Sequence, residues 1–308
     1  LKVFRPLARC ITGQVAGKLL GTDTFQETDV ISVTIPITKW NYQVTEAREI
    51  PYIVAKAFYI AATGRPGPVL IDLTRNAQLE MMDYHYEAIS RLDTVKVVTQ
   101  PAWEDIEQAV ALINSAKKPY LMVGHGVLIS GAQKELREFA EKTGIPVAST
   151  LLGLSAFPVE HPLYTGMLGM HGNYAPNMLS NEADVVIAVG MRFDDRVTMS
   201  LAGYLAKAKV IHIEIDPAEI DKNVRTTVPI VADAKQALRA ITALVHKNSH
   251  ETWLEEFKRL NRVEEEKIIK PGLSPAGGKI RMIEAMSRLS AKTKGKAVIV
   301  ADVGQHQM

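Results

Sequence analysis

The sequence predicts an α/β fold in which parallel sheets are covered by helices on both faces. Runs that are apolar throughout, at residues 119–124, 183–190 and 208–215, alternate with amphipathic helical stretches. Such runs are typical of parallel strands that are buried on both sides. The chain has 308 residues, of which 47% are hydrophobic, so it can form about two domains with sizeable cores.

The first hundred residues contain one clear helix and one clear strand. Residues 51–63 are apolar and open with a proline, which favours the first turn of a helix. The breaker-rich turn 64–67 separates them from an apolar run at 68–73, which we interpret as a buried strand. Residues 76–100 show no periodicity and are interpreted as a linker.

A regular alternation begins at Pro101. The helix expected at 103–118 places Ile106, Ala109, Val110 and Ile113 on one face. The remaining elements expected in this part are helices at 132–144 and 234–247 and strands at 119–124, 145–150, 183–190, 208–215 and 228–233.

Residues 251–308 are interpreted as a connection and the start of another α/β unit. Residues 251–278 combine a charged helix at 253–269 with a breaker-rich stretch, and we interpret them as a second linker. Residues 279–308 predict a helix followed by a strand at 298–304.

Composition excludes several classes of function. The 36 basic and 34 acidic residues nearly cancel and are mixed along the chain, so neither a nucleic acid nor a membrane surface is expected as a partner. No run approaches the roughly 20 apolar residues of a membrane span. Cys10 is the single cysteine, which fits a reducing compartment such as the cytosol or the interior of an organelle, and of these we expect the cytoplasm.

Glycines and acids mark several strand ends. Gly124 and Gly126 follow one expected strand, Gly190 follows another, and Glu214 and Asp216 end a third. Together they suggest a dinucleotide-like ligand, because parallel sheets bind such ligands beyond the carboxyl ends of their strands. Individually each is weak: ordinary strand-to-helix turns explain the glycines, and a helix cap explains an acid equally well.

The stretch RFDDR at 192–196 follows a buried strand and a glycine abruptly. Mixed charges usually form a solvated cluster. Arginine is nevertheless the side chain suited to planar carboxylates and phosphates, so this position favours a ligand site. The stretch MLGMHG at 167–172 has no second histidine or cysteine at metal-ligand spacing, which argues against zinc. Serine-hydrolase and phosphate-loop motifs are also missing from the sequence.

Several stretches together resemble the family of large, catalytic subunits of acetohydroxyacid synthase, also called acetolactate synthase. The matching stretches are ITGQV, GTDTFQETDV, GRPGPVLIDL, GIPVASTLLGL, MLGMHG, VGMRFDDRVT, HIEIDPAEIDKN and DVGQHQM. They occur in family order from residue 11 to 308.

The resemblance implies an enzyme that decarboxylates pyruvate on thiamine diphosphate and transfers the two-carbon unit to a second 2-keto acid, either pyruvate or 2-ketobutyrate. This reaction serves the biosynthesis of isoleucine, valine and leucine. The implied cofactors are thiamine diphosphate, magnesium and a structural FAD. The family also implies a homodimer of large subunits, with which a small regulatory subunit can associate.

The resemblance divides the chain into parts of three domains. Residues 1–80 match the second half of a pyrimidine-binding domain, and 81–100 a linker. Residues 101–250 match a complete central FAD-binding domain, 251–278 a second linker, and 279–308 the start of a diphosphate-binding domain. The glutamate that activates thiamine and the magnesium motif fall outside these residues, so we expect the 308 residues alone to be inactive.

Site residues are carried over only where the motifs match. Gln26 and Arg196 are implied as catalytic residues, and Phe25, Gln26, Met170 and Arg196 as substrate-binding residues, with Arg196 receiving the carboxylate of the second 2-keto acid. The implied FAD residues are Arg65, Gly124, His125, Gly126, Thr150, Leu151, Leu152, Met170, His171, Gly190, Met191, Arg192, Asp195, Glu214, Ile215, Asp233 and Ala234. Gly304, Gln305 and His306 match the loop that reaches thiamine diphosphate, and no metal ligand is expected in this chain.

The sequence departs from the family at four positions. Ala16, Lys18, Arg75 and His125 replace the residues that are usual there, so the channel wall and the glycine turn can differ in shape. Two other interpretations stay open. One is a related thiamine-diphosphate carboligase, such as a glyoxylate carboligase or an FAD-free acetolactate synthase. The other is a nucleotide-binding module without catalysis.

Overall fold

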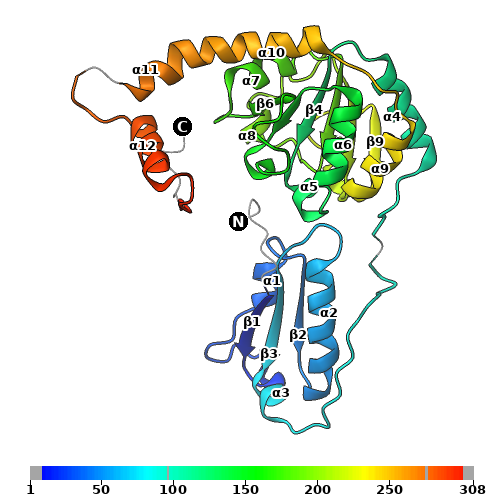
Figure 1. Ribbon diagram of the computed structural model, residues 1–308. Helices are drawn as coiled ribbons and strands as arrows, with labels where there is room; N and C mark the ends of the chain where they lie inside the picture. Colours follow the sequence, from blue (N-terminus) through cyan, green and yellow to red (C-terminus); the bar gives the residue numbers. More distant parts are fainter. Residues whose placement is uncertain (1–8, 96, 275–276, 301–308) are drawn as a thin grey trace. The chain divides into compact units, whose positions relative to one another are not determined.

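The computed structural model describes residues 9–95, 97–274 and 277–300, which form two compact units that divide between residues 97 and 98 (Figure 1). Unit 1 contains β1 (Arg9–Gln14), α1 (Val30–Thr34), β2 (Trp40–Val44), α2 (Ile50–Ala62), β3 (Val69–Thr74) and α3 (Arg75–Leu79). Its three strands are parallel, in the order β1-β3-β2.

The core of unit 1 lies between the sheet and α2. Ile53, Ala57 and Ile60 on α2 pack against Val69 and Ile71 of the central strand β3. The helix expected at 51–63 and the strand expected at 68–73 are therefore confirmed. Residues 81–95 contain neither helix nor strand.

Unit 2 is built on a six-stranded parallel sheet. Its elements are α4 (Trp103–Ser115), β4 (Pro119–Val123), α5 (His125–Ile129), α6 (Gln133–Thr143), β5 (Val147–Ser149), β6 (Tyr164–Met167), α7 (Tyr174–Ser180), β7 (Val185–Val189), α8 (Asp195–Thr198), β8 (Lys209–Glu214), β9 (Val228–Val231), α9 (Ala234–Leu244), α10 (Glu251–Glu264), a π-helical turn (Glu265–Ile269), α11 (Lys270–Leu273) and α12 (Met282–Thr293). All helices and strands predicted between residues 101 and 250 form in the expected order.

Helices cover both faces of this sheet, as the apolar strands predict (Figure 1). Successive residues of β4 face opposite sides: Leu121 and Val123 join the core beneath α4, α6 and α9, whereas Tyr120 and Met122 join the core beneath α7 and α10. On α4, the predicted inner positions Ile106, Ala109 and Ile113 are buried, and Val110 is partly buried.

The strand order is β6-β5-β4-β7-β8-β9. The chain starts in the middle of the sheet at β4, builds outward to β6, and then returns to the other side of β4 with β7. The direction of winding therefore reverses between β4 and β7, which is the arrangement of doubly wound nucleotide-binding sheets. In such sheets ligands bind where the carboxyl ends of the two central strands diverge.

The segment 251–278 contributes to the core of unit 2 and does more than connect. Trp253 and Phe257 of α10 are buried, and the Trp253 Nε1 donates to the Pro119 carbonyl at 3.0 Å. Asn261 Nδ2 donates to the Thr165 carbonyl of the edge strand β6 at 3.0 Å. An amphipathic helix placed in this way covers an otherwise open sheet edge.

The helix expected after residue 279 forms as α12, but the strand expected at 298–304 does not form within residues 298–300. Val298 and Val300 are each 92% exposed. A strand needs a neighbour that pairs with its backbone groups, and apolar composition alone does not provide one. The remaining residues of that prediction lie outside the described part of the chain.

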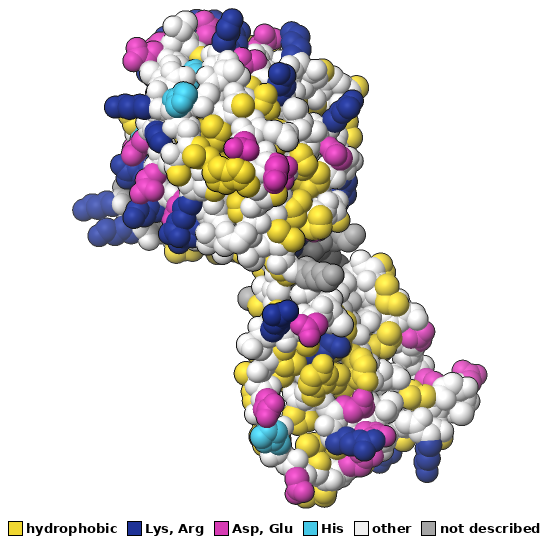
Figure 2. All heavy atoms as spheres, turned by 90° about the vertical axis from the view of Figure 1, so that its right-hand side faces the viewer, with side chains coloured by type: hydrophobic (Ala, Val, Ile, Leu, Met, Phe, Trp, Pro, Cys, Tyr) yellow, Lys and Arg dark blue, Asp and Glu magenta, His cyan; other side chains and the backbone are white. Residues whose placement is uncertain are grey.

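On the face shown in Figure 2, both units carry basic as well as acidic side chains. Among the described residues, no helix is long and apolar enough to cross a membrane.

Candidate functional site

The carboxyl edge of the six-stranded sheet collects most of the predicted site residues. Because all six strands are parallel, their carboxyl ends lie along one edge. The predicted residues that follow these ends are Gly124, His125 and Gly126 after β4; Thr150, Leu151 and Leu152 after β5; Met170 and His171 after β6; Gly190, Met191 and Arg192 after β7; Glu214 and Ile215 after β8; and Asp233 and Ala234 after β9.

The glycines lie where the two central strands part. Gly124 N–H donates to the Val189 carbonyl at 2.9 Å, and Gly126 N–H donates to the Gly190 carbonyl at 3.0 Å. A Cβ on Gly126 would lie 2.6 Å from Gly190 Cα, and Gly190 itself has φ +61°. Close contact between the two backbones therefore requires glycine here, and the crevice at the switch point carries no side chains from these positions.

The RFDDR stretch separates into two pairs of different character. Asp194 Oδ2 accepts from Arg192 Nε and Nη2, at 3.1 and 2.7 Å, and both side chains are mostly buried. The other Asp194 oxygen is buried and has no hydrogen-bond partner among the described residues. Asp195 and Arg196 are 3.8 Å apart, with 75% and 65% of their side chains exposed. The first pair is thus fixed, whereas the second is solvated.

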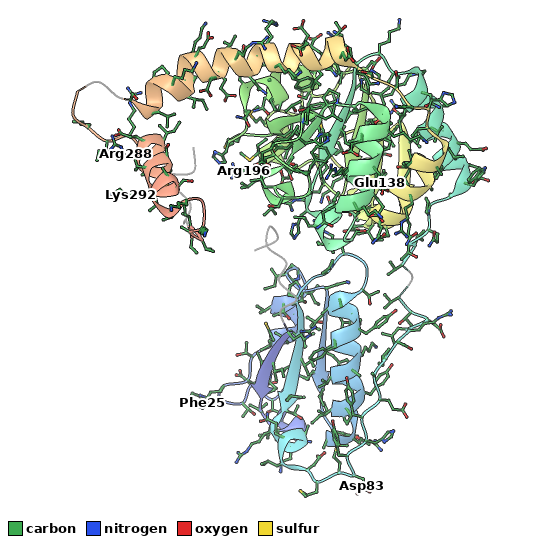
Figure 3. The ribbon with its side chains drawn as sticks, viewed as in Figure 1. Phe25, Asp83, Glu138, Arg196, Arg288 and Lys292 are labelled. Carbon is green, nitrogen blue, oxygen red and sulfur yellow. The ribbon has the colours of Figure 1, made fainter. Side chains whose placement is uncertain are left out.

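Arg196 meets the MLGMHG loop. The Met170 N–H donates to the Arg196 carbonyl at 2.7 Å, and Arg196 Nη1 lies 3.8 Å from the Met170 sulfur. Figure 3 shows the Arg196 side chain at the margin of unit 2, pointing outward. The structure therefore brings together two of the predicted substrate-binding residues, which are 26 positions apart in the sequence.

His171 lies in the same loop, and its Nδ1 is buried without a hydrogen-bond partner in the described part of the chain. A buried nitrogen of this kind is available to a bound ligand or an ordered water. His125 is already engaged, because its Nδ1 lies 2.9 Å from the Leu152 carbonyl and joins the turns after β4 and β5.

The acidic residues at the strand ends have local structural roles. Asp233 Oδ1 accepts from the Lys235 and Gln236 amides and caps α9, and Asp216 caps the following turn through the Ala218 amide. Glu214 Oε1 accepts from the Ile215 and Asp216 amides at 3.0 and 3.2 Å. The interpretation as caps, left open by the sequence, therefore describes Asp216 and Asp233 well.

His212 on β8 forms a hydrogen bond with the turn that follows β7. It is fully buried on β8, and its Nε2 donates to the Met191 carbonyl at 2.7 Å. Burial lowers the pKa of His212, and the hydrogen bond to Met191 offsets this only in part. The imidazole is therefore neutral at neutral pH. In the sequence, a histidine within an apolar strand is the one signal for this role.

Three predicted residues belong to unit 1. Phe25 and Gln26 lie in the loop before α1, where Phe25 is 87% exposed and Gln26 has φ +68°. Figure 3 shows Phe25 pointing away from the sheet of its unit. Arg65 lies in the turn between α2 and β3. Gly304, Gln305 and His306, predicted to reach thiamine diphosphate, lie outside the described residues.

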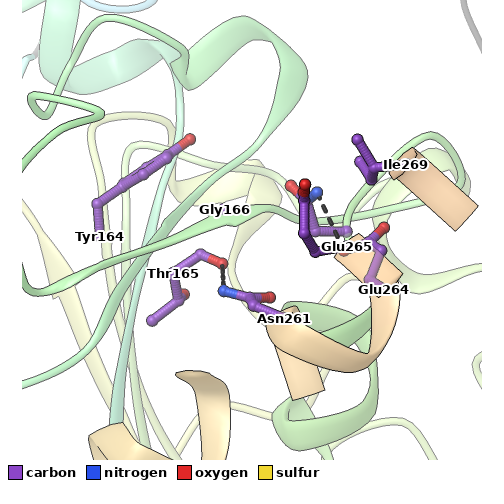
Figure 4. A pocket seen from close by; sticks show the side chains of 8 residues that line it. Tyr164, Thr165, Gly166, Asn261, Glu264, Glu265 and Ile269 are labelled. Carbon is purple, nitrogen blue, oxygen red and sulfur yellow. Dashed lines mark hydrogen bonds between the residues drawn. The ribbon is translucent and has the colours of Figure 1, made fainter. Parts of the chain in front are cut away.

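A cavity of about 240 Å³ lies beside the edge strand β6, away from the glycine turns (Figure 4). It is lined by Tyr164, Thr165, Gly166, Asn173, Asn261, Glu264, Glu265 and Ile269. None of the predicted site residues lines it. Within residues 9–95, 97–274 and 277–300, no group of three or more His, Cys, Asp or Glu side chains is arranged to hold a metal ion.

The sequence is similar to a family of thiamine pyrophosphate enzymes and to acetolactate synthases. Residues 106–241 match the family described as thiamine pyrophosphate enzyme, central domain. The chain is 42% identical over 97% of its length to acetolactate synthase 1, chloroplastic, of Oryza sativa subsp. japonica, and covers 46% of that protein.

Bacterial relatives give the same result. The acetolactate synthase large subunit of Corynebacterium glutamicum is 43% identical over 97% of this chain, which covers 48% of it. For the large subunit of Buchnera aphidicola subsp. Schizaphis graminum the identity is 39%, again over 97% of this chain, which covers 52% of that protein. The chain thus spans about half the length of these relatives. Residues 106–241 thus match the central domain of thiamine pyrophosphate enzymes, and the chain is similar to acetolactate synthase large subunits along nearly its whole length.

Proposed function

We propose that this chain is part of an acetolactate synthase large subunit, which decarboxylates pyruvate and joins the two-carbon unit to a second 2-keto acid in branched-chain amino-acid biosynthesis. The observation that carries the proposal is the similarity to acetolactate synthases over 97% of the chain, at 39–43% identity. The contact between Met170 and Arg196 supports it, because a guanidinium is suited to hold a 2-keto acid by its carboxylate.

The proposed cofactors are thiamine diphosphate, magnesium and FAD. Thiamine diphosphate, when bound, supplies the electron sink for decarboxylation. The residues at the sheet edge fit a dinucleotide such as FAD: a topological switch point, a crevice free of side chains at Gly126 and Gly190, and the unpartnered Nδ1 of His171. The carboxylates of Asp216 and Asp233 are used as caps, so recognition of FAD there falls to backbone groups.

Arg196 is the proposed anchor for the second 2-keto acid. Its exposed guanidinium has a loose partner in Asp195 at 3.8 Å, which an incoming carboxylate can replace. Phe25 and Gln26 are proposed to contribute to the substrate channel, and Gln26 to catalysis. Arg65 is proposed to contribute to FAD binding, and Gly304, Gln305 and His306 to thiamine diphosphate binding.

The proposed assembly is a homodimer of large subunits that can associate with a small regulatory subunit, in the cytoplasm. The domain limits given by the resemblance, with a central domain at 101–250 between parts of two thiamine-diphosphate-binding domains, are part of the same proposal.

The test is an assay of the full-length protein with pyruvate, thiamine diphosphate, magnesium and FAD. Acetolactate should form, and the purified protein should show the absorbance of bound oxidised flavin. A parallel panel contains 2-ketobutyrate and glyoxylate. Turnover of glyoxylate alone would show that the protein is a glyoxylate carboligase. Acetolactate formation without bound flavin would indicate the FAD-free type of acetolactate synthase. Binding of FAD without any turnover would indicate a nucleotide-binding module without catalysis.

A further inference from the structure

The side chain of Asn177 closes on the backbone of Gly169. Asn177 lies on α7, and its Nδ2 donates to the Gly169 carbonyl at 2.8 Å while its Oδ1 accepts from the Gly169 N–H at 2.9 Å. Both functional groups of the amide are therefore used on one residue. A carboxylate or an aliphatic side chain at this position cannot make both bonds, because only an amide offers a donor and an acceptor side by side.

Gly169 in turn lies directly against Arg196. It has φ +101°, and a Cβ built on it would lie 2.4 Å from the Arg196 carbonyl oxygen. The next residue, Met170, donates its N–H to that same carbonyl at 2.7 Å. The position of the Gly169 backbone therefore decides where Met170 meets Arg196.

The loop is closed on the other side as well. Gly172 N–H donates to the Gly169 carbonyl at 2.8 Å, so this carbonyl accepts from both Gly172 and Asn177. By contrast, the Arg196 guanidinium is held loosely within the described part of the chain, where it lies 3.8 Å from Asp195 and 3.8 Å from the Met170 sulfur. Its orientation consequently depends on how firmly the loop holds Met170.

We propose that Asn177 is a positioning residue for the acceptor site: it fixes Gly169, so that Met170 keeps Arg196 oriented toward the carboxylate of the second 2-keto acid. Asn177 itself touches neither substrate nor cofactor in this assignment. The inference rests on the proposed function and goes beyond it by naming a residue that acts through the Met170–Arg196 contact.

The test is a double-mutant cycle in the full-length enzyme. The variants are Asn177→Ala, which loses both bonds, Asn177→Asp, which keeps only the acceptor, Arg196→Ala, and the Asn177→Ala/Arg196→Ala pair. Asn181→Ala is the matched control, because Asn181 follows α7 and its Oδ1 accepts from the Leu205 amide, outside the loop. The measurements are kcat and KM for 2-ketobutyrate as acceptor at fixed pyruvate, together with flavin content and Tm.

Asn177→Ala should raise the KM for 2-ketobutyrate about tenfold, since small displacements of a positioning group have effects on this order. Asn177→Asp should do the same, and Asn181→Ala should not. The pair should be no worse than Arg196→Ala alone, because both changes remove the same interaction. A Tm loss without a change in acceptor KM, or fully additive effects in the pair, would overturn the inference. An active enzyme in which Arg196→Ala leaves the acceptor KM unchanged would instead refute the proposed role of Arg196, and a full-length protein without acetolactate formation would refute the proposed function.

Discussion

Arg196 and Met170 come from different strand ends and are joined by a backbone hydrogen bond at 2.7 Å as well as by their side chains. The arginines of the RFDDR stretch therefore have separate tasks. Arg192 is fixed by Asp194, whereas Arg196 remains mostly exposed beside Asp195. Of the two, Arg196 is therefore the one that we propose as the anchor for a carboxylate ligand.

Replacing Arg196 tests this division. Arg196→Ala in the full-length enzyme should lower kcat/KM for the second 2-keto acid about 10- to 100-fold, as expected when a hydrogen bond to a charged group is lost. Flavin content should stay unchanged. Arg196→Lys should recover only part of the loss, because an ammonium cannot grip a carboxylate bidentately. Steady-state kinetics of the two variants check this, with the exposed Arg259, paired with Glu256, as an arginine-to-alanine control. If Arg196→Ala had the same kcat/KM for the second 2-keto acid as the unsubstituted enzyme, the RFDDR stretch would be a solvated charge cluster on the surface.

The glycine contact at the switch point can be tested by stability. In Gly126→Ala the new Cβ would lie 2.6 Å from Gly190 Cα, so one backbone must move, at a cost of about 2 kcal/mol or more. Gly131→Ala is the control: Gly131 has φ +62° but no atom within 4 Å of its Cβ position, so it carries only backbone strain of about 1 kcal/mol. Denaturant unfolding should rank Gly126→Ala as the more damaging change, and the reverse order would contradict the contact.

At the scale of elements, α10 is attached to unit 2 by a few buried aromatic residues. Trp253 packs edge-on against Phe257, with ring centroids 4.9 Å apart, and Phe257 contacts Tyr120 of β4. Figure 1 shows α10 lying along α7, on the opposite side of the sheet from α6 and α9.

Trp253→Ala should destabilise unit 2 by about 3 to 5 kcal/mol, because it leaves a large cavity and an unpaired Pro119 carbonyl. Trp253→Phe should cost less, since it keeps most of the ring. The measurement is equilibrium unfolding followed by tryptophan-independent circular dichroism. If neither substitution changed the free energy of unfolding, α10 would not stabilise unit 2, and the interpretation of residues 251–278 as a linker would be right.

A second pair of helices is joined by a buried carboxylate. Glu135 on α6 is 4% exposed and accepts from Arg239 Nε and Nη2 of α9, at 3.0 and 2.8 Å. Burial alone raises the pKa of Glu135, but its own backbone amide, Arg239 and Lys235 outweigh burial and lower the pKa below its usual value.

This shift predicts a pH-dependent stability. The pKa of Glu135 is lower in the folded state than in the unfolded state, where it is about 4.3. The ionised carboxylate therefore stabilises the fold fully above this unfolded-state pKa, and the stabilisation is lost as the pH falls through the folded-state pKa. Glu135→Gln should therefore cost about 1 to 2 kcal/mol at pH 7 and progressively less toward pH 3. Unfolding free energies of both proteins at several pH values check this. A difference that does not vary with pH would show that packing, and not charge, joins the helices.

At the scale of the whole molecule, the two units have separate cores. Val44, Ile53 and Ile71 belong to the core of unit 1, whereas the two cores of unit 2 are formed on either side of its own sheet. The matched relatives are about twice as long as the 308 residues. Unit 2 contains the whole segment that matches the central domain.

The 308 residues expressed alone should accordingly bind FAD weakly and form no acetolactate. Flavin fluorescence quenching measures the binding, and a colorimetric acetolactate assay with added thiamine diphosphate and magnesium measures turnover. The full-length enzyme serves as the positive control. Acetolactate formation by the 308 residues would refute the expectation that groups outside them are required.

The class of the fold could be predicted from the sequence, and so could the position of the candidate site residues at strand ends, because apolar runs buried on both faces and glycines after strands are local signals. Periodicity predicted the helices and strands between 101 and 250 in their correct order. Periodicity did not predict the short edge strand β6. It also did not predict that α10 packs into the core, donates to the Pro119 carbonyl and donates to the Thr165 carbonyl. A strand at 298–304 was expected from composition and does not form over 298–300, where no partner strand pairs with it.

Which strand ends become neighbours, in contrast, depends on the assembled sheet. Sequence order runs from β4 through β5 and β6 to β7, yet the sheet sets β7 directly beside β4 and brings Gly126 to Gly190. In the same way, the assembled sheet brings the Asn177 side chain to the backbone of Gly169 and brings Met170 into contact with Arg196. Strand order and loop closure depend on burial and hydrogen bonding between distant segments, and these are settled only when the whole sheet has formed. Local patterns therefore predicted Arg196 as a candidate site residue, and the assembled sheet supplied its contact with Met170.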